Sequence, residues 1–185
     1  VFTAELQPRS GPPQVLFTAD ASDPRKRVSV LLAAMPRVLD AVPDARLVLA
    51  GGGGLPEQVD ERVRRATEAP GVIDLADVPA YYRRATMTVL PSVDEAFGLV
   101  LAESLACGTP VVGTESGGIT DIVSPDVGEL VPPDDPTALA EAIVRAIDLA
   151  RHPDTPARCV QRARQWDWDY VGPQHLAAYN SALRR

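Results

Sequence analysis

The sequence has little cysteine, histidine and lysine, and these shortages exclude several classes of protein. Only 2 of the 185 residues are cysteine, Cys107 and Cys159, which is too few for a disulfide framework and favours a reducing compartment. With only 2 histidines as well, the sequence shows no spacing typical of a metal site and no Ser/His/Asp set. No apolar run approaches the roughly 20 residues that cross a bilayer, so we expect no transmembrane helix.

The charge balance is acidic and argues against binding to nucleic acid. The chain carries 25 Asp and Glu against 18 Lys and Arg, so its net charge of -7 does not attract a phosphate polymer. Arginine supplies 17 of the basic residues, and Lys26 is the only lysine. The hydrophobic fraction of 45% and the charged fraction of 23% are typical of a globular domain, and the length fits a single one.

Short apolar runs alternate with segments of helical periodicity along most of the chain. The runs predict six strands, over residues 15–18, 46–50, 72–75, 86–90, 110–113 and 128–131. The segments between and after them predict helices, over residues 28–41, 56–68, 78–85, 98–107, 120–123 and 136–150. Continuous apolar strands that alternate with helices indicate a parallel sheet covered on both faces. We therefore expect an α/β fold, a Rossmann-like doubly wound parallel sheet with helices on both faces.

The same pattern divides the chain into three parts. We expect residues 1–14, which are rich in proline, to form an irregular lead-in, and residues 15–156 to form the Rossmann-like domain. Residues 157–185 contain both tryptophans and are expected to form a helical tail that packs on this domain or docks on another one. Ligands of doubly wound folds bind outside the carboxyl ends of the strands. The loops expected at that edge are residues 18–26, 51–54, 74–77, 91–98 and 113–118.

The segment after the fourth expected strand carries the sharpest chemical pattern. Glu95 lies in the loop and Glu103 about two turns into the next helix, and eight residues of helix correspond to a rise of ~12 Å. The two carboxylates are therefore too far apart to share one metal ion or proton, but they can hold two parts of one extended ligand. Carboxylates accept hydrogen bonds from vicinal hydroxyls, and the free amides of residues 97–99 at the helix start favour a diphosphate. The alternative is that Glu95 is simply an acid favoured near a helix start and Glu103 a surface residue.

Residues 91–112 closely resemble the signature of the family-4 retaining glycosyltransferases of the GT-B fold. That signature is Glu-x7-Glu, running through Phe-Gly and ending in Cys-Gly-Thr-Pro-Val-Val. Further segments resemble the family, namely residues 47–51, 82–92, 117–118, 128–133 and the tail around Trp168. The resemblance covers about residues 15–180 and corresponds to the C-terminal half of such an enzyme, which binds the nucleotide sugar.

The resemblance implies a role for each residue that matches the family motif. Glu103 would hold the ribose hydroxyls of the donor, and Glu95 would contact hydroxyls of the transferred sugar. The amides of Phe97, Gly98 and Leu99 would meet phosphate and sugar. Lys26, in the loop after the first strand, would lie on the diphosphate, where its ammonium offsets the charge of the leaving group.

The loop after the first strand departs from the family pattern. The family usually has Gly-Arg where this chain has Ala19-Asp20, and an aspartate there places a like charge near a diphosphate. Arg25, next to Lys26, is a candidate for the missing cation. Reduced donor affinity, a different donor and loss of activity are the three alternatives that this departure leaves open.

The resemblance therefore implies a domain that binds a nucleotide-diphosphate sugar and takes part in its retaining transfer. The acceptor would be held by a separate N-terminal domain, and no metal or other cofactor is expected. The expected location is the cytoplasm, with contact to the inner face of a membrane through the other domain. The alternatives are a non-catalytic module that binds nucleotide sugars, or a GT-B nucleotide-sugar epimerase, which needs further acids and histidines. Neither the base nor the oligomeric state is indicated.

Overall fold

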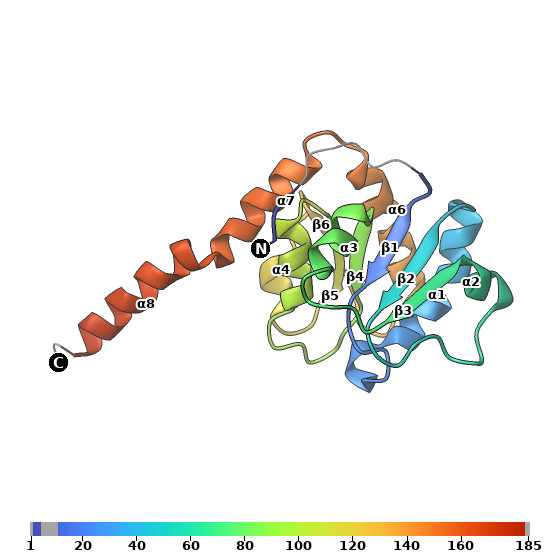
Figure 1. Cartoon of the computed structure of the whole chain (residues 1–185), viewed down its shortest axis with the longest axis horizontal. Helices are drawn as coiled ribbons and strands as arrows, with labels where there is room; N and C mark the ends of the chain where they lie inside the picture. The colour runs from blue at the N-terminus through green and yellow to red at the C-terminus, as the bar shows by residue number, and fades with distance from the viewer. Residues whose placement is uncertain (1, 5–10, 184–185) are drawn as a thin grey trace.

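The computed structural model describes residues 2–4 and 11–183, and its centre is one parallel sheet of six strands (Figure 1). The strands are β1 (Gln14–Phe17), β2 (Arg46–Ala50), β3 (Thr67–Gly71), β4 (Met87–Leu90), β5 (Val111–Thr114) and β6 (Gly128–Val131). Their order in the sheet is β3-β2-β1-β4-β5-β6, and every neighbouring pair is parallel. This order reverses direction beside β1, as in a Rossmann fold, and confirms the expected fold class.

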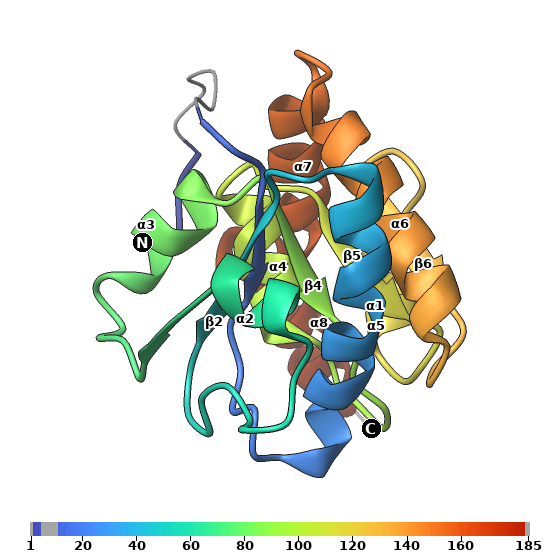
Figure 2. The same ribbon diagram turned by 90° about the vertical axis from the view of Figure 1, so that its right-hand side faces the viewer.

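Helices cover both faces of the sheet (Figure 2). One face carries α1 (Val28–Ala41), α2 (Glu61–Ala66) and α6 (Pro136–Ala150). The other face carries α3 (Val78–Arg84), α4 (Leu99–Ala106), α5 (Ile119–Ile122) and α7 (Thr155–Ala163). Two short 3-10 helices, η1 (Pro24–Lys26) and η2 (Arg164–Trp166), and the terminal helix α8 (Trp168–Ala182) complete the described chain.

Strand β2 shows why the central strands are apolar along their whole length. Leu47 and Leu49 pack into the core on the face that α1 and α2 cover, while Val48 and Ala50 pack with Tyr82 on the opposite face. Because successive side chains of a strand point to opposite faces, a strand covered on both sides needs an apolar residue at every position. This physical requirement is the reason that β1, β2, β4 and β5 are predicted within about one residue of their observed bounds.

The third strand was predicted over residues 72–75, and this prediction is wrong. The observed strand, β3, begins five residues before the predicted one and pairs with β2. Val72 and Leu75, in the predicted segment, are exposed. An edge strand forms hydrogen bonds with one neighbour only, so it tolerates Pro70 and needs no apolar pattern. The helix predicted from residue 56 begins only at Glu61, where Asp60 caps its first turn.

One part of the tail packs on the domain and another part extends away from it. Helix α7 does pack against α4, and its Cys159 is buried. Helix α8 has no buried residue and extends away from the sheet (Figure 1). Trp166, in η2, also packs on the domain, with its ring centroid 6.1 Å from that of Phe97, so α8 is the part of the tail that extends away from the domain. The division at residues 14 and 156 stays a prediction, and residues 1 and 5–10 of the lead-in lie outside the described residues.

Candidate functional site

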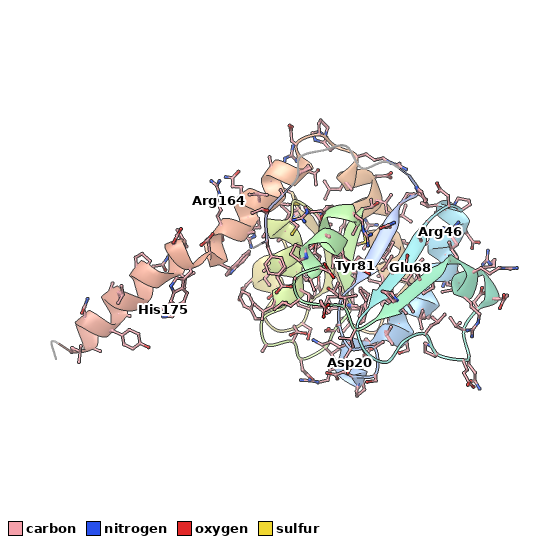
Figure 3. All side chains as sticks on the ribbon, in the orientation of Figure 1. Asp20, Arg46, Glu68, Tyr81, Arg164 and His175 are labelled. Atoms are coloured by element: carbon pink, nitrogen blue, oxygen red, sulfur yellow. The ribbon has the colours of Figure 1, made fainter. Side chains whose placement is uncertain are left out.

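The carboxyl ends of the strands lie at one edge of the sheet, and the loops that follow them interlock there. Figure 3 shows Asp20, after β1, and Arg46, at the start of β2, near opposite ends of the strands. The loop after β1 contacts two others, because Ala21 donates its N–H to the carbonyl of Gly52 at 2.9 Å and Arg25 accepts from the N–H of Val93 at 2.9 Å. The edge predicted to bind a ligand is therefore built from segments that lie far apart in the sequence.

The glycine-rich turn after β2 allows this close approach. A Cβ atom on Gly51 would lie 2.0 Å from the carbonyl oxygen of Ala19, and one on Gly53 would lie 2.4 Å from the amide nitrogen of Ser22. Gly53 also has a φ of +81°, which only glycine adopts without strain. These glycines hold the loop after β1 against the turn, so the structure gives them a packing role.

Asp20, the residue that departs from the family pattern, is held within its own loop. Its Oδ1 accepts hydrogen bonds from the amide of Ser22 at 2.9 Å and from the Ser22 hydroxyl at 2.6 Å. These two hydrogen bonds lower the pKa of Asp20, so the carboxylate is ionised near neutral pH. A negative charge is therefore present in the loop where the resemblance would place a cation.

The loop that carries Glu95 is fixed from the other side of the site. The carbonyl of Glu95 accepts the N–H of Gly118 at 2.9 Å, and a Cβ atom on Gly117 would lie 2.0 Å from the same carbonyl oxygen. The amide of Asp94 donates to the Ser116 hydroxyl at 3.0 Å, and Asp94 has a φ of 52°. The loop after β5 thus positions the backbone from which the Glu95 side chain extends.

Lys26 and Glu95 form an ion pair at this edge. Lys26 Nζ lies 2.5 Å from Glu95 Oε2, and the two side chains are 22% and 17% exposed. Helix η1 brings the lysine there, since Asp23 caps η1 through the amide of Arg25 and the Arg25 carbonyl is bonded to Val93. The structure thus brings together the chain's only lysine and the first glutamate of the motif, which are 69 residues apart.

Arg25, the other candidate cation, pairs with Asp23 in its own loop. Its guanidinium lies 2.7 Å from the Asp23 carboxylate, and the side chain is 66% exposed. The hydrogen bonds that Arg25 donates to Asp23 raise the pKa of Arg25, with smaller contributions from the charges of Glu95 and Asp94. Arg25 therefore interacts electrostatically with Glu95 and Asp94, but the side chain that it hydrogen-bonds in this structure is Asp23.

The start of α4 offers backbone donors beside the ion pair. Gly98 precedes the helix with a φ of 93°, and in the described chain no side chain caps this end. The first amides of a helix have no partner inside the helix, so the N–H groups of Gly98 and Leu99 are suited to bind an anion. Of the three predicted residues, Gly98 precedes α4 as its cap and Leu99 is its first residue, while Phe97 lies just before the cap.

Glu103 lies one turn further along α4 and has different partners. Tyr82, on α3, donates its hydroxyl to Glu103 Oε2 at 2.9 Å, and the Tyr82 oxygen lies 3.0 Å from Oγ1 of Thr18. Burial raises the pKa of Glu103, while the hydrogen bond from Tyr82 acts in the opposite direction. Neither Tyr82 nor Thr18 was predicted as a site residue. The signals in the sequence were that Thr18 begins a loop expected at the ligand edge and that the resemblance includes residues 82–92.

The described residues do not supply other catalytic groups of the common kinds. No group of three or more His, Cys, Asp or Glu among residues 2–4 and 11–183 could hold a metal ion. Burial raises the pKa of the Cys107 thiol to about 11, which favours the neutral thiol over the nucleophilic thiolate at neutral pH. Within the same ranges, no helix has the length and apolar character needed to cross a membrane.

A family model described as glycosyl transferases group 1 matches residues 12–148. The chain belongs to this family. The match covers the whole sheet and the loops at its carboxyl edge, so the resemblance inferred from residues 91–112 is confirmed.

The curated relatives of this group 1 glycosyl transferase chain are longer than the chain itself. It is 34% identical over 174 residues to phosphatidyl-myo-inositol mannosyltransferase of Mycobacterium leprae. This match covers 90% of the present chain and 46% of that protein. The chain is 37% identical over 193 residues to D-inositol 3-phosphate glycosyltransferase 1 of Catenulispora acidiphila, covering 99% of this chain and 44% of that protein. The chain therefore spans about half the length of the curated relatives it matches.

Solved structures show the same relationship. Sucrose-phosphate synthase from Thermosynechococcus elongatus superposes with a TM-score of 0.76 at 31% identity, over 94% of this chain and 46% of that one. The Anabaena protein HepE in complex with UDP-glucose gives a TM-score of 0.73 at 23% identity, over 93% of this chain and 49% of that one. The second likeness establishes the shared fold. The group 1 chain thus has the fold of one half of these two-part proteins.

Proposed function

We propose that this chain is the donor-binding half of a retaining glycosyltransferase. The donor is a nucleotide-diphosphate sugar that binds at the carboxyl edge of the sheet, and the acceptor is held by an N-terminal domain. The observation that carries the proposal is the Lys26–Glu95 ion pair beside the start of α4. It combines one cation, one carboxylate and a set of free amides, which are the groups that a sugar diphosphate requires.

Each group has a distinct task in the proposed reaction. The diphosphate lies against the amides of residues 97–99 and takes Lys26 as its counter-ion, which frees Glu95 to accept hydrogen bonds from sugar hydroxyls. When the bond between the sugar C1 and the diphosphate oxygen breaks, its electron pair passes to that oxygen. Lys26 and the dipole of α4 stabilise the added charge. The acceptor oxygen bonds to C1 on the same face of the sugar, and its proton passes to the departing diphosphate oxygen.

The nucleoside is proposed to lie further along α4. Glu103 has one oxygen bonded to Tyr82 and the other available to ribose hydroxyls. The base is proposed to lie near residues 73–77, which follow β3 at the same end of the sheet. HepE, which has the same fold, is described in complex with UDP-glucose, and this supports a nucleotide sugar as the ligand class.

Helix α8 supports a partner domain. Its exposed side chains Trp168, Leu176 and Tyr179 are spaced so that they lie on one face, and Leu183 continues that face just past the helix end. An apolar stripe on an unpacked helix indicates a docking surface. Since the chain spans about half the length of its relatives, the domain that completes the enzyme is the proposed partner. That domain would also provide any contact with the inner face of a membrane, and the cytoplasm is the proposed location.

Calorimetric titration with UDP, GDP and ADP tests the donor site. We expect one nucleotide to bind saturably, and we expect Lys26→Met to weaken it about tenfold or more, because a charge-assisted contact is lost. Arg46→Met is the matched control, since Arg46 is an exposed cation at the opposite edge of the sheet (Figure 3). Absence of binding, or an equal loss in both variants, would contradict the proposed site.

A non-catalytic module that binds nucleotide sugars is the second candidate. The observation that favours it is the ionised Asp20 in the loop after β1. Transfer assayed with the complete protein, including its N-terminal domain, separates the two candidates. Donor binding without transfer would favour the module, and Asp20→Arg would then be expected to tighten donor binding.

A further inference from the structure

Three polar side chains form a chain of hydrogen bonds behind the predicted ribose site. Thr18 follows β1, Tyr82 lies on α3, and Glu103 lies on α4, so three separate elements contribute. The Tyr82 oxygen is 3.0 Å from Thr18 Oγ1 and 2.9 Å from Glu103 Oε2. Tyr82 itself is completely buried, whereas Glu103 is partly exposed. The buried tyrosine therefore connects the end of β1 to a carboxylate that solvent and ligands can reach.

The direction of these hydrogen bonds follows from the protons that are available. Burial and the neighbouring charge of Glu103 raise the pKa of Tyr82, so the phenol keeps its proton at neutral pH. An ionised carboxylate only accepts, so that single proton is donated to Glu103. The Tyr82 oxygen then accepts from Thr18, whose hydroxyl supplies the second proton. The chain runs in one direction, from Thr18 through Tyr82 to Glu103.

This arrangement leaves one carboxylate oxygen free and fixes where it lies. Oε2 of Glu103 accepts from Tyr82, so a ligand hydroxyl finds Oε1 and the second lone pair of Oε2 as acceptors at a defined position. A glutamate side chain has three rotatable bonds, and an unrestrained carboxylate would lose their freedom when a ligand binds. The bond to Tyr82 removes part of that freedom before the ligand arrives.

We propose that Tyr82 is a positioning residue that holds Glu103 as the acceptor for the ribose hydroxyls, and that it thereby sets the preference for ribonucleotides over 2′-deoxyribonucleotides. Thr18 supports Tyr82 from the far end of the chain. This inference rests on the proposed function, because it assumes that a nucleotide lies at Glu103. It adds two residues and a selectivity that the motif itself does not contain.

The competing explanation is that Tyr82 has only a packing role. Its ring lies in the core with Leu16, Val48 and Ala85, and removal of the whole side chain would disrupt that core. Tyr82→Phe keeps the ring and removes only the hydroxyl, so it separates packing from positioning. Tyr81→Phe is the matched control, because Tyr81 neighbours Tyr82 on α3 but stacks with Arg84 at 4.6 Å.

The experiment is titration of the chain with UDP, GDP and ADP and with their 2′-deoxy counterparts. For the unmodified chain we expect the ribonucleotide to bind about tenfold more tightly than the deoxy form, the range of one hydrogen bond to a charged group. In Tyr82→Phe we expect this ratio to fall to about threefold or less, with most of the loss in the ribonucleotide. Thr18→Val should reduce the ratio in the same direction, and Tyr81→Phe should keep it.

Each alternative result has a definite meaning. A weaker affinity for both forms in Tyr82→Phe, at an unchanged ratio, would overturn the positioning role and leave packing. An unmodified chain that binds nucleotide without a ribose preference would overturn the inference but not the proposed function. Failure of the unmodified chain to bind any nucleotide would overturn both. If Tyr82→Phe does not fold, Thr18→Val tests the same ratio from the other end of the chain.

Discussion

Replacing Glu95 with glutamine should tighten binding of the free nucleoside diphosphate while it abolishes transfer. In the structure Glu95 neutralises Lys26, the cation proposed for the diphosphate, at a distance of 2.5 Å. A bound diphosphate must compete with Glu95 for that ammonium, and the carboxylate also repels the ligand. Glutamine removes the competing charge and keeps the shape of the side chain, so both effects act in the same direction.

The size of the effect follows from the exposure of the pair. Exposed ion pairs contribute about 0–1 kcal/mol, and removal of one partner from a buried pair costs about 3–5 kcal/mol. The Lys26 and Glu95 side chains are 22% and 17% exposed, so their pair lies between these limits, at about 1–2 kcal/mol. Since 1.4 kcal/mol corresponds to a factor of ten, we expect roughly fivefold to thirtyfold tighter binding.

Calorimetry at low and high ionic strength is the assay for this prediction. The gain should shrink as salt screens the site, because it arises from charge. Asp94→Asn is the control, since it removes a neighbouring exposed acid without breaking the pair, and asparagine tolerates the positive φ of this position. Unchanged or weaker binding in Glu95→Gln, or an equal gain in Asp94→Asn, would refute the reasoning.

Three further predictions concern stability. Burial raises the pKa of Glu103 in the folded state above its usual value of 4.5, so the contribution of Glu103 to the free energy of unfolding falls as the pH rises from 4.5. Urea denaturation should therefore show Glu103→Gln gaining stability relative to the unmodified chain between acidic and neutral pH. Gly117→Ala should lower the free energy of unfolding by about 1–3 kcal/mol and weaken nucleotide binding, because its Cβ would clash with the Glu95 carbonyl. The control Gly54→Ala, at a φ of +63° with open space around it, should lower it by about 1 kcal/mol without affecting binding. Truncation after Asp167 should change the free energy of unfolding by less than about 0.5 kcal/mol, since α8 has no buried residue.

Each of these predictions has a contrary result. A Glu103→Gln variant whose stability tracks the unmodified chain across the pH range would show that burial of this carboxylate has no energetic effect. Equal losses in Gly117→Ala and Gly54→Ala would show that contact with the Glu95 carbonyl is unimportant. A large fall in stability on removing α8 would show that the helix packs on the domain in solution.

The central part of the fold could be predicted from the sequence because burial constrains it strongly. Strands such as β2 are covered on both faces, so they read as unbroken apolar runs, and their bounds are close to those predicted. Strand β3 is held by backbone hydrogen bonds to one neighbour, and Thr67–Gly71 therefore carries no pattern that identifies it. For the tail, the sequence left open whether it packs on this domain or docks on another one, since helical periodicity does not reveal which partner surface is present.

For the site, the sequence by itself determined the residue types, the spacing of Glu95 and Glu103, and the family to which they point. It placed Lys26 in the right loop, because the carboxyl ends of parallel strands share one edge. Only the tertiary structure decided that Lys26 pairs with Glu95, that Arg25 pairs with Asp23 instead, and that Tyr82 supports Glu103. The physical reason is that side-chain pairing depends on where crossover connections bring distant loops together, and Lys26 and Glu95 lie 69 residues apart along the chain.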